Sequence, residues 1–293
     1  MSAGIRALPV PRRTVLALVL ASLVGILMFG WPLIAGPGSI LERNASGPLI
    51  LGAVLVGVMA IVLIALGDGG IDVKAIAILG LLSGVGAVLR PLSAGSAGIE
   101  FVFFFIILGG RVFGPGFGFA LGSTTLFASA LLTGGVGPWL PFQMLAASWI
   151  GMGAGLLPAW VRGRAEIAVL ALYAALCGFL YGQAMNLSFW PFTLGPDMAL
   201  SFIPGAPLGE TLKTFFLFSI ATSFGWDLMR AVVLTGGVAL IGRPVLTALR
   251  RTARRAFFSD TLPEPPRGRQ NPGSGSDTPE PGAKHKPLHI VVH

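Results

Sequence analysis

Charged side chains are scarce in this sequence. Only 11% of the 293 residues are charged, whereas 54% are apolar and 42 are glycine; an ordinary globular domain has about 25% charged residues. Between Phe101 and Val161 the single charged side chain is Arg111. A soluble domain of that length needs more charge to keep its surface in water, so the composition excludes a soluble protein and indicates a polytopic membrane protein.

Catalytic and metal-binding motifs are also absent. The sequence has no G-x-x-x-x-G-K-[ST] loop for ATP hydrolysis, and neither H-E-x-x-H nor G-x-S-x-G occurs. The one cysteine, Cys177, lies in an apolar run, as is typical of a small buried hydrophobe. The three histidines, His285, His289 and His293, fall in the polar tail. We therefore expect no enzyme, no cofactor and no metal.

Long apolar runs predict about eight transmembrane helices. A spanning helix needs about 20 mainly apolar residues. One run, Ile99–Gly110, is short but rich in Phe and Ile, and we expect it to span with the small residues before it. The other predicted helices are Thr14–Ile34, Pro48–Leu66, Val73–Leu89, Pro115–Leu132, Pro141–Val161, Ala165–Met185 and Leu212–Ile241.

Basic residues are unevenly distributed over the ends of these helices. With the N-terminus in the cytoplasm, every basic residue from Arg243 onward falls inside, whereas only Arg43, Arg90 and Lys213 fall outside. This positive-inside asymmetry predicts a multi-pass plasma-membrane protein with both termini cytoplasmic. It also explains the net charge of +8 without a nucleic-acid partner. A signal peptide is the alternative for the first apolar run, but Thr14–Ile34 is longer than the apolar region of a typical one.

The sequence divides into three parts. Residues 1–66 hold the cytosolic N-terminus and two plain helices, whose only intramembrane polar group is Ser22, and we expect an accessory hairpin there. Residues 73–255 hold the other six helices and all the unusual residues, which indicates the functional unit. Residues 259–293 are rich in Pro, Gly, Ser and charge and predict a disordered cytosolic tail.

Small residues recur at helical spacing. For the glycine stripes that begin at Gly114 and Gly151, packing within the chain is the favoured interpretation, because small faces let membrane helices approach closely. The helix Val73–Leu89 differs, because small residues cover nearly all its faces and exceed what one neighbour requires. We expect this helix to meet a second, sliding partner. The candidate docking residues are Ala77, Gly80, Gly84 and Ala87.

Polar residues inside a membrane are costly and are functional candidates. Asp227 and Arg230 lie three residues apart on one helix face and can pair; they either hold the bundle together or contact a ligand. Glu100 opens the Phe-rich run near Arg90, where a boundary salt bridge is the alternative to ligand binding. Gln143 either reads a polar group of a ligand or caps its own helix.

Several aromatic and amide residues map to outer loops or outer helix ends. Apolar faces with a few polar anchors form small-molecule pockets, although an interfacial aromatic belt is the alternative for the tryptophans. We expect a pocket that opens outward, formed by the loops Arg90–Gly98, Thr133–Leu140 and Asn186–Gly209. The candidate substrate-binding residues are Trp139, Phe142, Gln143, Asn186, Trp190, Glu100, Arg90, Asp227 and Arg230.

Four stretches resemble the substrate-binding S component of energy-coupling factor (ECF) transporters: Ala87–Arg90, Phe101–Gly110, Arg111–Gly118 and Gly137–Met144. The resemblance spans Val73 to Arg255. Its most specific piece is the Gly-Pro-Trp-x-Pro-Phe-Gln-Met run, whereas the Phe-Gly-Pro turn is common to many S components. Among the subfamilies, the sequence is most similar to the cobalamin-type S component of actinobacteria.

This resemblance implies a six-helix membrane protein that captures a vitamin from outside and works with a T subunit and two ABC ATPases. It places Val73–Leu89 at the family's first helix, whose small residues dock on the T subunit, and it gives no role to the two N-terminal helices. We therefore expect the S subunit of an ECF-type vitamin importer. The alternatives are a polytopic membrane enzyme or lipid-handling protein that uses Asp227 and Arg230, or a standalone secondary transporter, for which we see no internal repeat.

Overall fold

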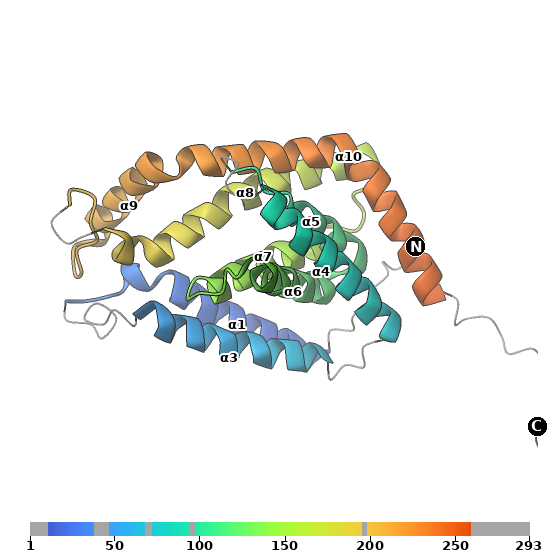
Figure 1. The fold of residues 1–293 in the computed structure, drawn as a ribbon, viewed down its shortest axis with the longest axis horizontal. Coiled ribbons are helices and arrows are strands. Elements are labelled where there is room, and N and C mark those ends of the chain that lie inside the picture. The colour runs from blue at the N-terminus through green and yellow to red at the C-terminus, as the bar shows by residue number, and fades with distance from the viewer. Residues whose placement is uncertain (1–10, 38–46, 68–71, 94–97, 195–197, 259–293) are drawn as a thin grey trace, which may run out of the picture. The chain divides into compact units, whose positions relative to one another are not determined.

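The computed structural model describes residues 11–37, 47–67, 72–93, 98–194 and 198–258. Within these ranges the chain is all-helical (Figure 1), and six helices are long and apolar enough to cross a membrane. The expected all-α membrane fold is confirmed. The predicted tail 259–293, with its histidines, lies outside the described residues. The elements are α1 (Arg12–Phe29), the 3-10 turn η1 (Trp31–Leu33), α3 (Gly47–Gly67), α4 (Val73–Ser93), α5 (Val102–Phe113), α6 (Pro115–Thr133), α7 (Leu140–Leu156), α8 (Arg164–Thr193), α9 (Leu208–Thr222) and α10 (Phe224–Phe258).

Glycine and proline set several helix boundaries. Gly114, with a φ of 96°, ends α5, and Pro115 begins α6, which ends at Gly134 with a φ of 64°. Glycine adopts a positive φ at little cost, and proline is suited to a first helical turn because its missing N–H would have no partner there. α7 likewise has Pro141 in its first turn. The punctuation seen in the sequence therefore coincides with real helix ends.

The last predicted helix, Leu212–Ile241, is instead two helices, α9 and α10, separated at Ser223. The Ser223 hydroxyl donates to the carbonyl of Ser219 at 3.1 Å, and Asn186 of α8 donates to the Ser219 hydroxyl at 3.3 Å and also to the Ser223 hydroxyl. Such local polar bonds compete with the helical ladder. The break gives α10 a separate start beside α8.

Several predicted helix ends differ from the observed ones. α1 ends at Phe29 rather than Ile34, and α5 runs from Val102 to Phe113 rather than from Ile99 to Gly110. α8 continues beyond Met185 to Thr193, and α7 ends at Leu156 rather than Val161. Pro158 lies two residues beyond the end of α7, whereas Asn186 and Ser188 lie inside the continuation of α8. Hydropathy alone therefore misplaced these two boundaries.

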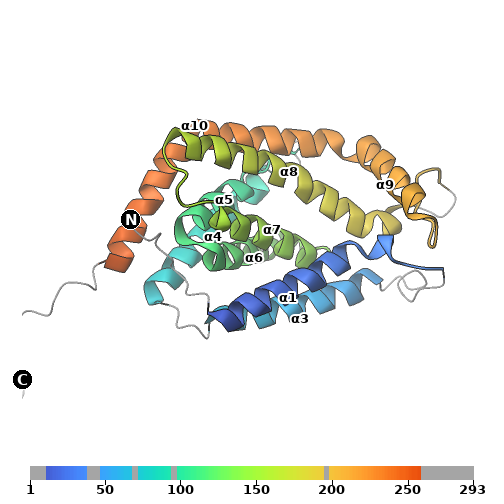
Figure 2. The same ribbon diagram turned by 180° about the vertical axis from the view of Figure 1, so that it is seen from behind.

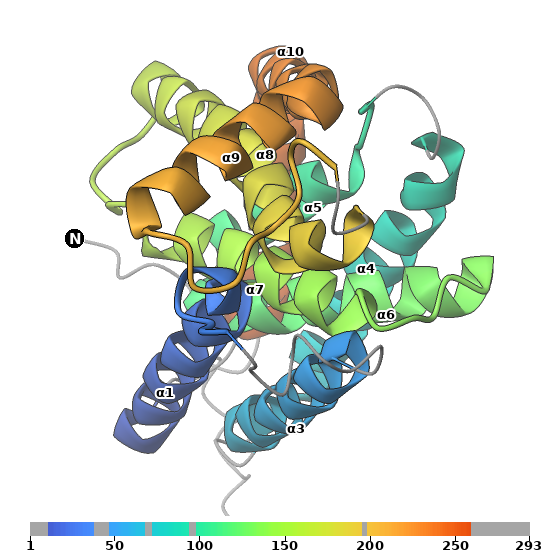
Figure 3. The same cartoon turned by 90° about the vertical axis from the view of Figure 1, so that its left-hand side faces the viewer.

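The short helix α5 lies at the centre of the bundle. It contacts α4, α6, α7, α8 and α10, and Figure 3 shows it among these helices. Its side chains Phe103, Ile107 and Leu108 are fully buried. Since neighbouring helices cover α5 on all sides, its aromatic and aliphatic surface forms the main core.

The glycine stripes of α6 and α7 bring two backbones into contact. A Cβ atom added at Gly118 would lie 2.2 Å from the carbonyl oxygen of Gly151, and one added at Gly122 would lie 2.3 Å from that of Ala147. These glycines therefore pack within the chain, as expected. A Cβ atom at Gly80 or Gly84 of α4 would meet nothing within 4 Å.

The helices α1 and α3 pair with each other and lie against α7 (Figure 2). The Thr14 hydroxyl of α1 donates to the carbonyl of Ala65 in α3 at 2.9 Å. We use the name hairpin for residues 12–37 and 47–67, which hold α1, η1 and α3. We call the end of the bundle with the α6–α7 connection the outer end, and the end with the α7–α8 connection the inner end, after the predicted orientation.

Candidate functional site

A cavity of about 310 Å³ lies at the outer end, between the segment before α5, the last turn of α6 and the first turn of α10. This volume is at the lower limit of the range usual for small-molecule sites, about 300–1,000 Å³. The cavity wall combines both signs of charge, two indole rings and two hydroxyl groups. These side chains belong to Arg90, Glu100, Trp139, Trp226, Ser129 and Thr133.

Both charged side chains of the cavity wall are hydrogen-bonded to residues that lie outside the wall. Arg90 donates from Nη2 to the Oε1 atom of Gln143 at 2.8 Å. Glu100 accepts two hydrogen bonds from Arg230, at 3.1 Å from Nε and 3.3 Å from Nη2. The structure thus brings five of the candidate residues together, with Arg90, Glu100 and Trp139 in the wall and Gln143 and Arg230 behind it.

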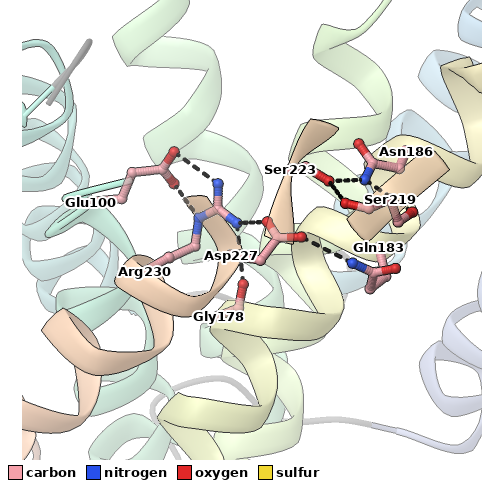
Figure 4. A network of polar contacts seen from close by, with 8 residues as sticks. All are labelled: Glu100, Gly178, Gln183, Asn186, Ser219, Ser223, Asp227 and Arg230. Carbon is pink, nitrogen blue, oxygen red and sulfur yellow. Dashed lines mark hydrogen bonds and ion pairs between the residues drawn. The ribbon is translucent and has the colours of Figure 1, made fainter. Parts of the chain in front are cut away.

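Arg230 is the centre of a buried ion cluster (Figure 4). Its Nη1 atom donates to Asp227 at 2.7 Å and to the carbonyl of Gly178 at 3.2 Å, and its guanidinium lies 5.3 Å from the ring centre of Tyr181. Gln183 donates to the second oxygen of Asp227 at 3.0 Å. The expected pairing of Asp227 with Arg230 is therefore confirmed.

Two glycines allow the elements around this cluster to approach. A Cβ atom at Gly182 of α8 would lie 1.7 Å from the Asp227 carboxylate, so a larger residue would displace α10 from α8. Gly98 has a φ of 91°, and a Cβ atom there would lie 2.3 Å from the carbonyl oxygen of Trp226. This close contact fixes the segment that carries Glu100 against the start of α10.

The four charged groups of this region balance. Arg90 and Arg230 carry two positive charges, and Glu100 and Asp227 carry two negative charges. A net charge is expensive to bury in a low-dielectric site unless it is paired. The region is therefore suited to a ligand that is uncharged or zwitterionic.

The Ser129 hydroxyl was not among the sequence candidates. Its side chain is 0% exposed and lines the cavity, and among the described residues its Oγ atom has no hydrogen-bond partner. Leaving a buried donor unpaired costs about 1–3 kcal/mol, which makes Ser129 a candidate site residue. Trp226 was also missed; in the sequence it lies in the middle of a predicted helix, far from any expected helix end.

The remaining candidates lie behind the cavity rather than in its wall. Phe142 is buried and packs edge-to-face on Phe29 of α1, with ring centres 5.2 Å apart. Trp190 is buried in an aromatic cluster with α9. Asn186 holds the α9–α10 junction through hydrogen bonds. Direct ligand contacts by these three residues stay a prediction.

Comparison with known families gives one match. The model of the substrate-specific component of ECF transporters matches residues 74–241. The chain belongs to this family. No curated protein and no solved structure matches. The match covers this S component from α4 into α10, so the cavity and its ion cluster lie inside the matched region and the hairpin lies outside it.

The S component has a second ion cluster, at its inner end. Glu166 accepts from Arg111 at 2.8 Å and from Arg250 at 2.6 Å. Arg111 also donates to three backbone carbonyls in residues 157–161, at 2.8–3.2 Å. The Glu166 side chain is 3% exposed. This cluster ties α5, α8 and α10 to the α7–α8 connection, and sequence reasoning missed it because its members are far apart in the chain.

A metal site is not evident in the part of the chain that the structure describes. There, no three His, Cys, Asp or Glu side chains lie close enough together to hold an ion. The expectation that this S component needs no resident metal or cofactor stays a prediction.

Proposed function

We propose that this S component captures a vitamin or cofactor precursor from outside the cell, at the outer cavity, and releases it inward with the help of a T subunit and two ABC ATPases. The family match carries the assignment as a substrate-specific transporter subunit. The outer cavity, with its paired charges and unpaired hydroxyl, supports the position of the ligand. The absence of a nucleotide-binding loop in the sequence supports an external source of energy.

Within this proposal the cavity residues have distinct roles. Trp139 and Trp226 offer flat apolar surfaces for a ring, Arg90 and Glu100 orient polar groups, and Ser129 supplies a hydrogen bond. Residues behind the wall keep these groups in place. They are Gln143 for Arg90, and Arg230 with Asp227 for Glu100.

The cavity volume bears on the class of vitamin. At about 310 Å³ it accommodates a compact one- or two-ring molecule. A cobalamin, with its corrin ring and nucleotide loop, is several times larger. The volume and the balanced charges therefore favour a small, flat, uncharged or zwitterionic ligand, and they lend no support to the cobalamin-type resemblance.

The hydrogen bonds of Asp227 favour a transport function over the enzyme and lipid-handling alternatives. Both carboxylate oxygens of Asp227 accept hydrogen bonds, one from Arg230 and one from Gln183. A general acid or base must reach its substrate directly or through one water. The pair is arranged to support Glu100 rather than to exchange protons with a ligand.

The exposed small-residue face of α4 is proposed to dock the T subunit. Ala77, Gly80 and Gly84 are exposed there, whereas Ala87 faces the core. The double substitution of Gly80 and Gly84 by Leu should block ATP-dependent uptake and leave ligand binding intact, because the added side chains hold the partner helix away. The matched control is Gly57→Leu on α3, where a Cβ atom also meets nothing within 4 Å. Normal uptake by the double variant would show that α4 is not the docking face.

Affinity purification tests the function as a whole. The tagged protein should retain a T subunit and two ABC ATPases, and mass spectrometry of the denatured sample should identify the small molecule it carries. Uptake of that molecule should require ATP. A protein that transports it alone, or that converts it chemically, would contradict the proposal.

The orientation is proposed from the positive-inside distribution, with both termini cytoplasmic. In a Cys177→Ala background, Val136→Cys should react with an impermeant thiol reagent applied to intact cells, since Val136 is 61% exposed at the outer end. Trp160→Cys should not react, although Trp160 is 82% exposed at the inner end. The reverse labelling pattern would show that the protein has the opposite orientation in the membrane.

A further inference from the structure

The hairpin precedes the region that matches the family, and the sequence gives it no function. In the structure its outer end reaches two parts of the bundle that are far apart in the chain. One is the start of α7, which follows Trp139 in the cavity wall. The other is residues 198–207, which connect α8 to α9 and which we call the outer segment.

Trp31, in η1 of the hairpin, is the main contact with α8 and the outer segment. It is 2% exposed and donates from Nε1 to the carbonyl of Ser188 at 3.2 Å. Its ring stacks on Phe192 of α8, with centres 5.3 Å apart, and meets Phe202 of the outer segment at 5.8 Å. A buried tryptophan with its N–H paired fixes its neighbours more firmly than an aliphatic residue would.

The outer segment is held at three further points. Phe202 also packs against Trp190 at 5.5 Å, and Trp190 donates to the carbonyl of Leu200 at 2.7 Å. The backbone N–H of Gly205 donates to the carbonyl of Ala35 in the hairpin at 3.2 Å. Gly205 has a φ of 77°, and a Cβ atom there would lie 2.5 Å from Pro37 of the hairpin.

The outer segment in turn sets the position of α9. Trp190 and Phe202 belong to one aromatic cluster with Phe215 and Phe218 of α9. α9 leads through the Ser223 junction directly to Trp226 in the cavity wall. Packed rings therefore connect Trp31 to α9, and the chain continues from α9 to Trp226 in the cavity wall.

The hairpin also contacts residues next to Trp139, the second indole of the cavity wall. Phe29 packs on Phe142, the neighbour of Gln143. A Cβ atom at Gly52 of α3 would lie 3.2 Å from the carbonyl oxygen of Pro138, the residue before Trp139. The hairpin thus contacts the residue next to Trp139 directly, and it reaches the Trp226 side through the outer segment and α9.

The attachment of the hairpin to α7 is close along its length. Trp149 donates from Nε1 to the hydroxyl of Ser22 in α1 at 3.0 Å. Ser22 is the intramembrane polar residue noted above for the first two predicted helices. A Cβ atom at Gly25 would lie 2.5 Å from Leu145. These side-chain contacts anchor α1, which carries Trp31 just beyond its end, on α7.

We propose that Trp31 is a positioning residue and that the hairpin is a built-in clamp, which holds the outer segment and α9 in place and so sets the spacing of the two tryptophan walls. The hairpin is then an integral part of the binding unit and moves with it. The clamp itself does not depend on the identity of the ligand or on the partner subunits.

Thiol accessibility of the outer segment tests the clamp directly. In a Cys177→Ala background, Ser201→Cys places a reporter at a site that is 5% exposed. With the purified full-length protein in detergent, adding Trp31→Ala should raise the labelling rate of this reporter by about tenfold or more, because local opening becomes easier. Trp31→Phe keeps the ring contacts but loses the hydrogen bond, so the increase should be smaller.

Two controls make the result decisive. Trp160→Ala removes a tryptophan that is 82% exposed at the inner end, and it should leave the labelling rate unchanged. Gly205→Ala loosens the clamp from the other side, because its Cβ atom would meet Pro37; it should raise the rate even if Trp31→Ala fails to fold. Gel filtration confirms that each variant is folded.

If folded Trp31→Ala and Gly205→Ala variants label as slowly as the Ser201→Cys reporter alone, the clamp proposal is wrong. An equal increase in Trp160→Ala would also overturn it, because general loosening would then explain the effect. The measurement uses no ligand and no ATPase. A negative labelling result therefore contradicts the clamp but does not bear on the proposed transport function. Conversely, failure to purify the partner subunits does not bear on the clamp.

Discussion

The inner and outer ion clusters use the same side-chain chemistry in opposite arrangements. At the inner end one carboxylate, Glu166, is shared by two cations, Arg111 and Arg250, and its side chain is 3% exposed. At the outer end one cation, Arg230, is shared by two carboxylates, Asp227 and Glu100. The Glu100 side chain is 30% exposed and lies in a cavity wall.

Removing one carboxylate has different consequences at the two ends. Loss of the shared anion at the inner end leaves two arginines without a carboxylate, and Arg111 is buried against backbone carbonyls. Loss of Glu100 at the outer end leaves Arg230 paired with Asp227. Among the described residues, the inner cluster therefore has no second carboxylate to replace Glu166, whereas the outer cluster keeps its Asp227–Arg230 pair when Glu100 is lost. This difference supports the proposal that Glu100 can pair with a ligand group.

The largest expected effect is on stability. Glu166→Gln should lower the free energy of unfolding by about 3–5 kcal/mol, because it removes the partner of a buried ion pair. Glu100→Gln should cost about 1 kcal/mol or less, since Glu100 is partly exposed and Arg230 keeps Asp227. Thermal unfolding of both variants in the same detergent measures the contrast. Similar losses would show that the two ends are equivalent.

A smaller effect is expected on ligand affinity at the outer end. Gln143→Leu removes the acceptor that orients Arg90, and affinity for the molecule retained on purification should fall by about tenfold to a hundredfold, or 1–3 kcal/mol. Tyr173→Phe is the control, since it removes a 2.7 Å hydrogen bond to Ile150 away from the cavity. Calorimetric titration should show a loss for Gln143→Leu alone. Lost stability with preserved affinity would make Gln143 purely structural.

The smallest effect concerns Ser129. Ser129→Ala should leave the unfolding temperature unchanged or slightly raised, because its hydroxyl has no partner among the described residues. Affinity should fall about fivefold to tenfold, the loss of one neutral hydrogen bond. Ser148→Ala is the control, because Ser148 is equally buried but its hydroxyl already donates to Met144 at 2.8 Å. An unchanged affinity in Ser129→Ala would remove this residue from the site.

Sequence reasoning predicted contacts that helix geometry fixes. Asp227 and Arg230 lie three residues apart, so a helix alone places them together. Their partner Glu100 is separated from Arg230 by 130 residues, and helical periodicity does not specify which distant ends meet. The same limit explains why the Arg111–Glu166 pair was missed, although Arg111 stands out in the sequence as the single charge in a long apolar region.

The end of the bundle at which a side chain lies was easier to predict than the direction in which the side chain points. Phe142 and Trp190 lie near the outer end, as their place in the sequence indicated, but their helices turn them toward other aromatic rings. The sequence gave little indication that Ser129 is a site residue, because the hydroxyl of a helical serine usually donates to a carbonyl one turn back. The break at Ser223 was missed although Thr222, Ser223 and Gly225 interrupt the apolar run there, because serine, threonine and glycine are also common inside membrane helices.

The most direct test of the account compares two tryptophans, Trp139 in the outer cavity wall and Trp160 at the inner end. The measurement is equilibrium binding of the molecule retained on purification to Trp139→Ala and Trp160→Ala, with stability measured alongside. The account predicts that Trp139→Ala lowers affinity by about tenfold or more and that Trp160→Ala leaves it unchanged. Equal affinities in the two folded variants would contradict the claim that the outer cavity captures the ligand.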